Sequence, residues 1–313
     1  MATRSCLCAF LLFLVFAFQS PIIRANIFPL PPRECRQLSF ATLARFEFLS
    51  QLIQLRTEFL LRSSIGVGIN DISPGLIQGG PAPIGAAIAT LDNVTRGIIE
   101  QFGLNGVGHL RAIVDVTALN PPLPRPLIDV RAEAFANVLG LGGLVPPFNV
   151  YNNRLRFLLA ANLLTNLLVQ YEGAIAPAII GNDEQRLLSG IERTNAAELG
   201  VIRAQLYASV NATVPPYTLT VRNLTDIIAE TVNLRGRCDV KEEGLIVPLQ
   251  LGAQNRTTVN VVPADVNSLA FTRIETEVLR IIFATANATI TGGLLPSGLF
   301  GAAFRLILAL RLG

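Results

Sequence analysis

The stretch Asn153-Arg-Leu-Arg-Phe-Leu-Leu-Ala-Ala-Asn-Leu-Leu-Thr-Asn-Leu-Leu-Val-Gln-Tyr-Glu-Gly-Ala174 decides the fold. Its leucines recur at intervals of three and four residues, which is the period of an α-helix with a buried face. The leucines in question are Leu155, Leu158, Leu159, Leu163, Leu164, Leu167 and Leu168. The pattern predicts a long, well-buried helix.

Three further long segments have the same periodicity, at about residues 42–65, 92–119 and 182–210. Asp92 is a good N-cap for the second of these segments, and the diproline after Asn120 stops it. A second diproline, Pro215-Pro216, follows the last segment. Four helices of about 22–28 residues are what an antiparallel four-helix bundle requires. The chain is therefore expected to be all-α.

A fifth periodic segment lies at about residues 220–234, and further helices are expected at about 130–139 and 273–284. Gly- and Pro-rich connections join the helices. After Arg235 the pattern weakens into a loop-rich region with two strand-like pieces, at 245–247 and 259–262. Residues 298–312 are apolar but contain two arginines, so we interpret them as a helix that packs on the bundle; the alternative is a lipid-anchor signal. This organisation gives a signal peptide at 1–25, a bundle at 40–234 and a C-terminal extension at 235–313.

The composition excludes several classes of function. Charged residues make up only 15% of the chain, against roughly 25% in an ordinary soluble domain. High hydrophobicity, 51%, excludes a disordered polyelectrolyte stress protein. The single histidine, His109, excludes a His-rich zinc site and a haem with two His ligands. The sequence contains no basic patch with interleaved aromatic residues, so it gives no indication of nucleic-acid binding.

The N-terminus has the pattern of a secretory signal peptide. Arg4 precedes an apolar run, Cys6 to Phe18, and small or polar residues lead to a cut after Ala25. The run is short for a membrane span, which needs about 20 apolar residues; an uncleaved anchor is the alternative. Cleavage removes Arg4 and Arg24 and no acid, which lowers the net charge from +3 to +1. The mature chain is then nearly neutral and secreted, without a stable membrane span.

Cleavage also removes Cys6 and Cys8, which leaves Cys35 and Cys238. Two cysteines in an exported chain most simply form one disulfide, and two free buried thiols are the alternative. Five Asn-x-Ser/Thr sequons predict a glycoprotein, with acceptors Asn93, Asn211, Asn223, Asn255 and Asn287.

A helical bundle is a natural location for a two-metal carboxylate site, with one Glu on each of two helices and Glu-x-x-His on each of the others. The candidate ligands, one on each long helix, are Glu58, His109, Glu172 and Glu198. The sequence departs from this motif at position 106, three residues before His109, where glycine stands in place of glutamate. The fourth helix has no histidine. A degenerate iron or manganese site is therefore expected. The alternative is a hydrogen-bonded core histidine and three acids paired with Arg56, Arg203 or water.

A set of sequence blocks resembles the desiccation-related proteins of plants. In chain order the blocks are Gly79-Gly-Pro-Ala-Pro-Ile-Gly85, Val107-Gly-His-Leu-Arg-Ala-Ile113, Arg125-Pro-Leu-Ile-Asp129, Pro146-Pro-Phe-Asn-Val-Tyr151, Val201-Ile-Arg-Ala-Gln-Leu-Tyr207, Glu242-Glu-Gly-Leu-Ile-Val-Pro248, Asp265-Val-Asn-Ser-Leu-Ala-Phe-Thr-Arg273 and Gly292-Gly-Leu-Leu-Pro-Ser-Gly298. The resemblance implies a ferritin-like helical domain, a secretory route and expression linked to water deficit. It implies no established catalytic reaction.

Within this resemblance, Glu58 matches the first-helix glutamate of the family and His109 the histidine of its Glu-x-x-His motif. Gly106 stands where that motif has glutamate. Asn195 falls where a fourth-helix glutamate is usual, although a small shift brings Glu192 nearer.

The expected function is that of a secreted, non-catalytic ferritin-like protein of desiccation or stress tolerance, at the cell wall or apoplast. Its partners would be cell-wall polymers or further copies of itself. The alternative is an iron- or manganese-binding protein, either oxidase-like or sequestering, that uses the four candidate ligands.

Overall fold

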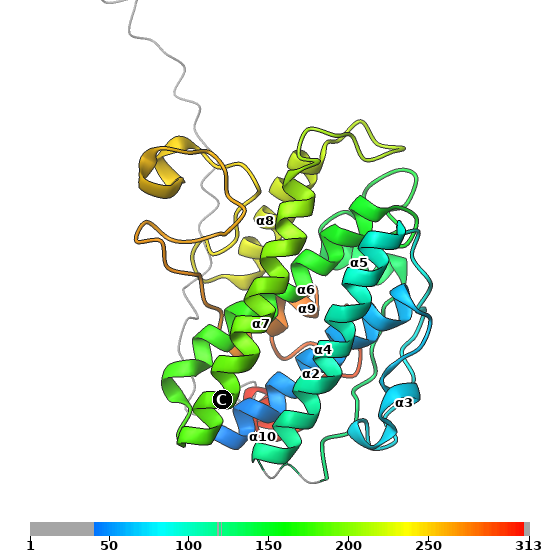
Figure 1. The fold of residues 1–313 in the computed structure, drawn as a ribbon, viewed down its shortest axis with the longest axis vertical. Helices are drawn as coiled ribbons and strands as arrows, with labels where there is room; N and C mark the ends of the chain where they lie inside the picture. The colour runs from blue at the N-terminus through cyan, green and yellow to red at the C-terminus, as the bar shows by residue number, and fades with distance from the viewer. Residues whose placement is uncertain (1–40, 118, 120, 310–313) are drawn as a thin grey trace, which may run out of the picture. The chain divides into compact units, whose positions relative to one another are not determined.

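Four long helices form the centre of the computed structural model, which describes residues 41–117, 119 and 121–309 (Figure 1). They are α2 (Thr42–Ser64), α4 (Asn93–Thr117), α6 (Arg154–Ile175) and α7 (Asn182–Tyr207). Helix α2 packs against α4 and α6, and α7 packs against the same two helices. The predicted all-α four-helix bundle is confirmed.

The helix starts follow the capping residues in the sequence. Asp92 accepts a hydrogen bond from the backbone N–H of Thr95 at 2.9 Å, as expected for the N-cap of α4. Asn153 accepts one from the N–H of Leu155 at 2.7 Å and caps α6. The connection from α4 to α6 is long and contains α5 (Ala132–Val138), whereas α6 and α7 are joined by a short turn, η2 (Ala176–Ala178).

Helix α6 is buried on nearly all sides, because other elements also cover its outer face. Its inner face meets α2 and α7, and its outer face meets α9 (Glu275–Ile282). This explains why its buried positions include polar residues as well as leucines: Arg156, Asn162, Thr165, Asn166, Gln170 and Glu172.

The rest of the chain packs around these helices. Helix α8 (Val221–Gly236) packs against α9, and α10 (Ala302–Ala309) packs against α2. Helix α10 buries Phe304 and exposes Arg305, as expected for a helix lying on a protein surface. The two strand-like pieces meet in a single antiparallel bridge between Ile246 and Val259. The described residues contain no extended β-strand.

The remaining short elements lie in the connections. They are α3 (Ile69–Ile72) and η1 (Pro74–Leu76) between α2 and α4, and η3 (Leu249–Leu251) and η4 (Ala253–Asn255) in the extension. No helix among residues 41–117 and 121–309 is long and apolar enough to cross a membrane. The predicted signal peptide and Cys35 lie outside the described residues.

Candidate functional site

The side chain of Arg56 on α2 occupies the interior of the bundle and is 1% exposed. Its Nε donates to the hydroxyl of Thr165 on α6 at 2.9 Å. One terminal nitrogen donates to Oδ1 of Asn195 on α7 at 3.4 Å, and the other forms an ion pair with Glu198, also on α7. The guanidinium group therefore connects three of the four bundle helices.

Glu198 completes this connection, because its second carboxylate oxygen accepts a hydrogen bond from Nδ2 of Asn105 on α4 at 2.7 Å. The ion pair thus touches every helix of the bundle. Glu198 is 3% exposed, so the ion pair is effectively excluded from water. We call Arg56, Asn105, Thr165, Asn195 and Glu198 the arginine centre.

Glu172 on α6 adjoins the arginine centre through Asn195, whose Nδ2 donates to its Oε1 at 2.7 Å. The other oxygen, Oε2, is buried and has no hydrogen-bond partner among residues 41–117 and 121–309. Burial raises the pKa of Glu172 to about 8, against the smaller lowering effects of the Asn195 hydrogen bond and the Arg56 charge. At neutral pH the carboxyl group is therefore mainly protonated and uncharged.

His109 on α4 is half-buried, and its Nδ1 is buried without a hydrogen-bond partner in the described part of the chain. The side chain lines a groove between α4 and α7 together with Asp115, Asp183 and Arg186. Burial, and to a smaller degree the charge of Arg56, lowers the pKa of His109 to about 4. The imidazole is neutral at physiological pH.

Glu58, the fourth predicted ligand, is bound on a different side of α2. It accepts a hydrogen bond from Nε of Arg62 at 2.7 Å and one from the backbone N–H of Ile69 at 3.3 Å, and it forms an ion pair with Arg125. Arg125 in turn donates to the carbonyls of Pro81 at 2.8 Å and Gly80 at 3.2 Å. Glu58 therefore anchors the connection between α2 and α4.

Close packing of α2 against α4 explains the glycine that replaces the glutamate of the expected motif. A Cβ atom on Gly106 would lie 2.0 Å from Oγ1 of Thr57, and one on Gly103 would lie 2.6 Å from Cδ2 of Leu61. Even an alanine at position 106 would therefore overlap with the hydroxyl group of Thr57, so a glutamate there requires the Thr57 side chain to move.

These residues do not fit a two-metal site. Glu58 is held by Arg62 and Arg125, and Glu198 is paired with a permanently charged guanidinium. Metal ligands must instead be deprotonated and free to coordinate. Within the part of the chain that the structure describes, no group of three or more His, Cys, Asp or Glu side chains could hold a metal ion.

The bundle matches the model of a known family, the ferritin-like domain, over residues 43–208. The chain belongs to the ferritin-like family. The match spans all four bundle helices, and the resemblance that the sequence blocks indicated is confirmed.

Two characterised relatives of this family cover most of the chain. Ferritin-like catalase Nec2 of Nesocodon mauritianus is 37% identical over 86% of this chain and 87% of its own length. Desiccation-related protein PCC13-62 of Craterostigma plantagineum is 36% identical over 85% of each chain. No solved structure matches the chain.

Buried arginines recur in the structure, and the sequence analysis named only Arg56 and Arg203 among them as partners of acids. Among the residues that the structure describes, four arginines are at most 1% exposed: Arg56, Arg125, Arg203 and Arg273. Each faces a glutamate, and three of them lie in or between the sequence blocks of the resemblance. Arg203, for example, lies 3.8 Å from Glu242 of the next block. For Glu58, the only local sequence signal that it would pair with an arginine is Arg62, which lies four residues later on the same helix face.

The remaining predicted sites are the glycosylation sequons and the two cysteines. The sequon acceptors Asn93, Asn211, Asn223 and Asn255 are exposed, and Asn287 is half-buried. Cys238 is buried directly after α8. Since Cys35 lies outside the described residues, the disulfide stays a prediction, as does glycosylation.

Proposed function

We propose that this protein is a secreted, non-catalytic member of the ferritin-like family that acts in desiccation or stress tolerance. The observation that carries the proposal is the Arg56–Glu198 ion pair at the centre of the bundle. The name of the relative PCC13-62 supports the link to desiccation.

Charge balance supports the absence of a metal. The guanidinium of Arg56 stays protonated at every physiological pH and has five N–H donors but no lone pair for a metal. Its single positive charge compensates the single negative charge of Glu198, while Glu172 is held neutral by its raised pKa. A divalent ion placed beside this group would be repelled by it and would compete with it for the same carboxylate.

The N-terminal pattern and the surface position of the sequons support secretion to the cell wall or apoplast. There, a glycosylated bundle tied by a Cys35–Cys238 disulfide would persist through water loss. Cell-wall polymers and further copies of the chain are the partners we propose for it.

Elemental analysis of the full-length protein, purified after secretory expression, tests the proposal. We expect far less than one iron or manganese ion per chain, and an unchanged far-ultraviolet circular dichroism spectrum after treatment with a chelator. Stoichiometric iron or manganese that survives purification would refute the non-catalytic proposal.

The alternative is a metal-dependent oxidase-like, catalase-like or metal-sequestering protein. The 37% identity to a relative named a ferritin-like catalase favours testing it. Oxygen release from hydrogen peroxide should be measured on the same preparation, with His109→Ala and Glu172→Gln variants in parallel. Peroxide breakdown that both substitutions abolish would favour this alternative, whereas a His109→Ala variant with full metal content would exclude His109 as a ligand.

A further inference from the structure

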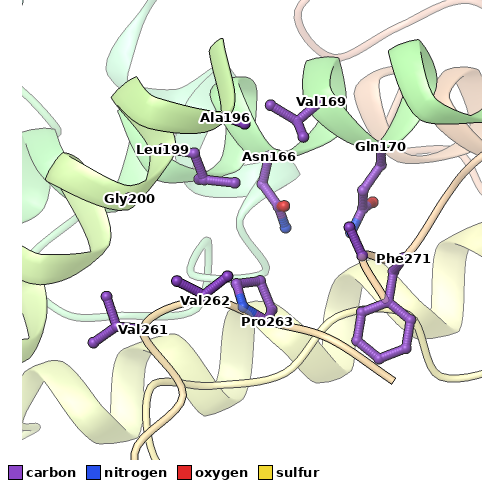
Figure 2. Close-up of a pocket in the computed structure, with 11 residues that line it drawn as sticks. Asn166, Val169, Gln170, Ala196, Leu199, Gly200, Val261, Val262, Pro263 and Phe271 are labelled. Carbon is purple, nitrogen blue, oxygen red and sulfur yellow. The ribbon is translucent and has the colours of Figure 1, made fainter. Parts of the chain in front are cut away.

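A small cavity lies between α6, α7 and a segment of the C-terminal extension (Figure 2). Its volume is about 90 Å³, and its third wall is the segment 261–271 of the C-terminal extension. Most of the lining is apolar: Val169, Ala196, Leu199, Gly200, Val261, Val262, Pro263, Ala270 and Phe271. Asn166 and Gln170 of α6 provide the amide groups.

Both ends of the segment 261–271 are fixed by buried arginines, so the cavity is preformed. At one end, Arg203 donates to the carbonyls of Asn260 at 2.6 Å and Val261 at 3.0 Å. At the other end, the backbone N–H of Arg273 donates to the carbonyl of Gln170 at 3.0 Å, and its Nε donates to Oε1 of Gln170 at 2.8 Å. A preformed site avoids the entropic cost of ordering a loop when a ligand binds.

Asn166 supplies one unused hydrogen-bond acceptor to this cavity. Its side chain is 2% exposed and points from α6 toward Val262 and Pro263 (Figure 2). The Nδ2 group donates to Glu242, but Oδ1 accepts no hydrogen bond from any residue that the structure describes. Gln170, by contrast, uses both ends of its amide, because its Nε2 donates to the carbonyl of Lys241 at 2.9 Å.

The lining selects for uncharged molecules, because it contains no ionisable side chain. A charged ligand would lose its hydration here without gaining a counter-ion. The volume is smaller than the ~150 Å³ of an apolar protein cavity that binds benzene. A short aliphatic body therefore fits, with one hydroxyl group that can donate to Asn166.

We propose that the cavity between α6, α7 and residues 261–271 binds a small uncharged molecule with an apolar body and one hydroxyl donor. This site is independent of the arginine centre and of the proposed function. Asn166 fixes the orientation of the hydroxyl group, and the carbon atoms of Val169, Leu199 and Phe271 enclose the body.

Methyl NMR of the full-length protein, titrated with propan-1-ol, tests the proposal. We expect saturable shifts of the methyl groups of Val169, Leu199, Val261 and Val262, and no saturable shifts with propanoate, which has the same chain length and a charge. A Gly200→Leu variant adds a side chain to the cavity lining, and its Cβ atom meets nothing within 4 Å. It should weaken propan-1-ol binding by at least about tenfold.

Gly190→Leu is the matched control, since Gly190 also lies on α7 with nothing within 4 Å of its added Cβ but lines the His109 groove instead. This variant should bind propan-1-ol as the wild type does. Linear shifts that never saturate, equal binding of propanoate, or unchanged binding by Gly200→Leu would each overturn the proposal.

Discussion

Arg56 and Glu198 form an ion pair in the interior of the bundle, although 142 positions separate them in the chain. Removing two charges from water costs several kcal/mol for each ion, and good geometry with additional hydrogen bonds is needed to offset that cost. Thr165, Asn195 and Asn105 supply those hydrogen bonds. Removal of one partner would leave the other as an uncompensated buried charge, so the loss of the ion pair should be measurable as a loss of stability.

Replacement of Arg56 by methionine should destabilise the protein by about 3–5 kcal/mol, because Glu198 is left as a buried charge without a counter-ion. Urea unfolding at pH 7 measures this loss. A second substitution, Glu198→Gln, should recover part of it, since glutamine is uncharged and still accepts a hydrogen bond from Asn105.

The matched control for this change is Arg222→Met. Arg222 lies on α8, is about half exposed and faces Asp226 at 3.9 Å. Exposed pairs of this kind contribute roughly 0–1 kcal/mol, so little change is expected. If Arg56→Met proves as stable as Arg222→Met, the ion pair has no central role.

The raised pKa of Glu172 should make the folded state less stable as the pH rises from 6.5 to 8. In this range the unfolded carboxyl group, with a pKa near 4.5, is ionised, whereas the folded group with a pKa of about 8 keeps its proton. The folded state then binds more protons, so each unit of pH costs up to about 1.4 kcal/mol. The stabilisation by the protonated Glu172 carboxyl group is complete below its unfolded-state pKa of 4.5. It is lost as the pH rises through its folded-state pKa of about 8.

A Glu172→Gln variant should have a flatter stability profile in urea unfolding between pH 6.5 and 8. Glutamine keeps the acceptor for Asn195 but cannot ionise. The titration of His109 in the unfolded state, with a pKa of 6.5, is common to the variant and the wild type and cancels in their comparison. Parallel profiles for the variant and the wild type would contradict the raised pKa.

The pKa of His109 can be measured directly, because the chain contains a single histidine and its imidazole gives one set of NMR signals. We expect a midpoint near pH 4 in the folded protein, below the ordinary value of 6.5. Stability should consequently fall as the pH drops from 6.5 to 4, since only the unfolded state takes up the proton in that range. A midpoint at or above 6.5 would show that the imidazole is solvated.

Arg56→Met gives a second measurement on the same signal. Removal of the positive charge should raise the His109 midpoint, but burial, the larger cause, should keep it below 6.5. An unchanged midpoint would mean that Arg56 and His109 do not interact.

The helices of this protein were predictable because their signals are local. The leucine spacing of α6 and the N-caps Asp92 and Asn153 are each contained within a few residues of the element that they define. The same holds for α9, whose predicted range contains the observed helix.

The candidate site was less predictable because its geometry depends on distant residues. The position of Glu58 on α2 is compatible with an inward side chain, but Arg125, 67 residues later, binds it on another side. The pairing of Glu198 with Arg56 was among the alternatives that the sequence left open, and the structure selects it. Nothing local in the sequence identifies Asn105 and Thr165 as partners of that pair.

The glycine at position 106 should be required by the packing of α2 against α4, so that Gly106→Ala destabilises the protein. In an exposed helix interior, replacement of Gly by Ala stabilises by roughly 0.5–1 kcal/mol. Here the added Cβ would lie 2.0 Å from Oγ1 of Thr57, and overpacking of this kind costs about 1–3 kcal/mol. Urea unfolding should therefore show a net loss, and Gly106→Glu a larger one.

Two further variants separate this clash from a general effect of substitution in α4. Gly108→Ala is the control, because its Cβ meets nothing within 4 Å, and it should be neutral or stabilising. Thr57→Ala removes the hydroxyl group that Gly106→Ala meets, so the double variant should be more stable than Gly106→Ala alone. If a Gly106→Glu protein instead folds with wild-type stability and gains stoichiometric manganese, helix packing does not exclude the glutamate of the metal motif.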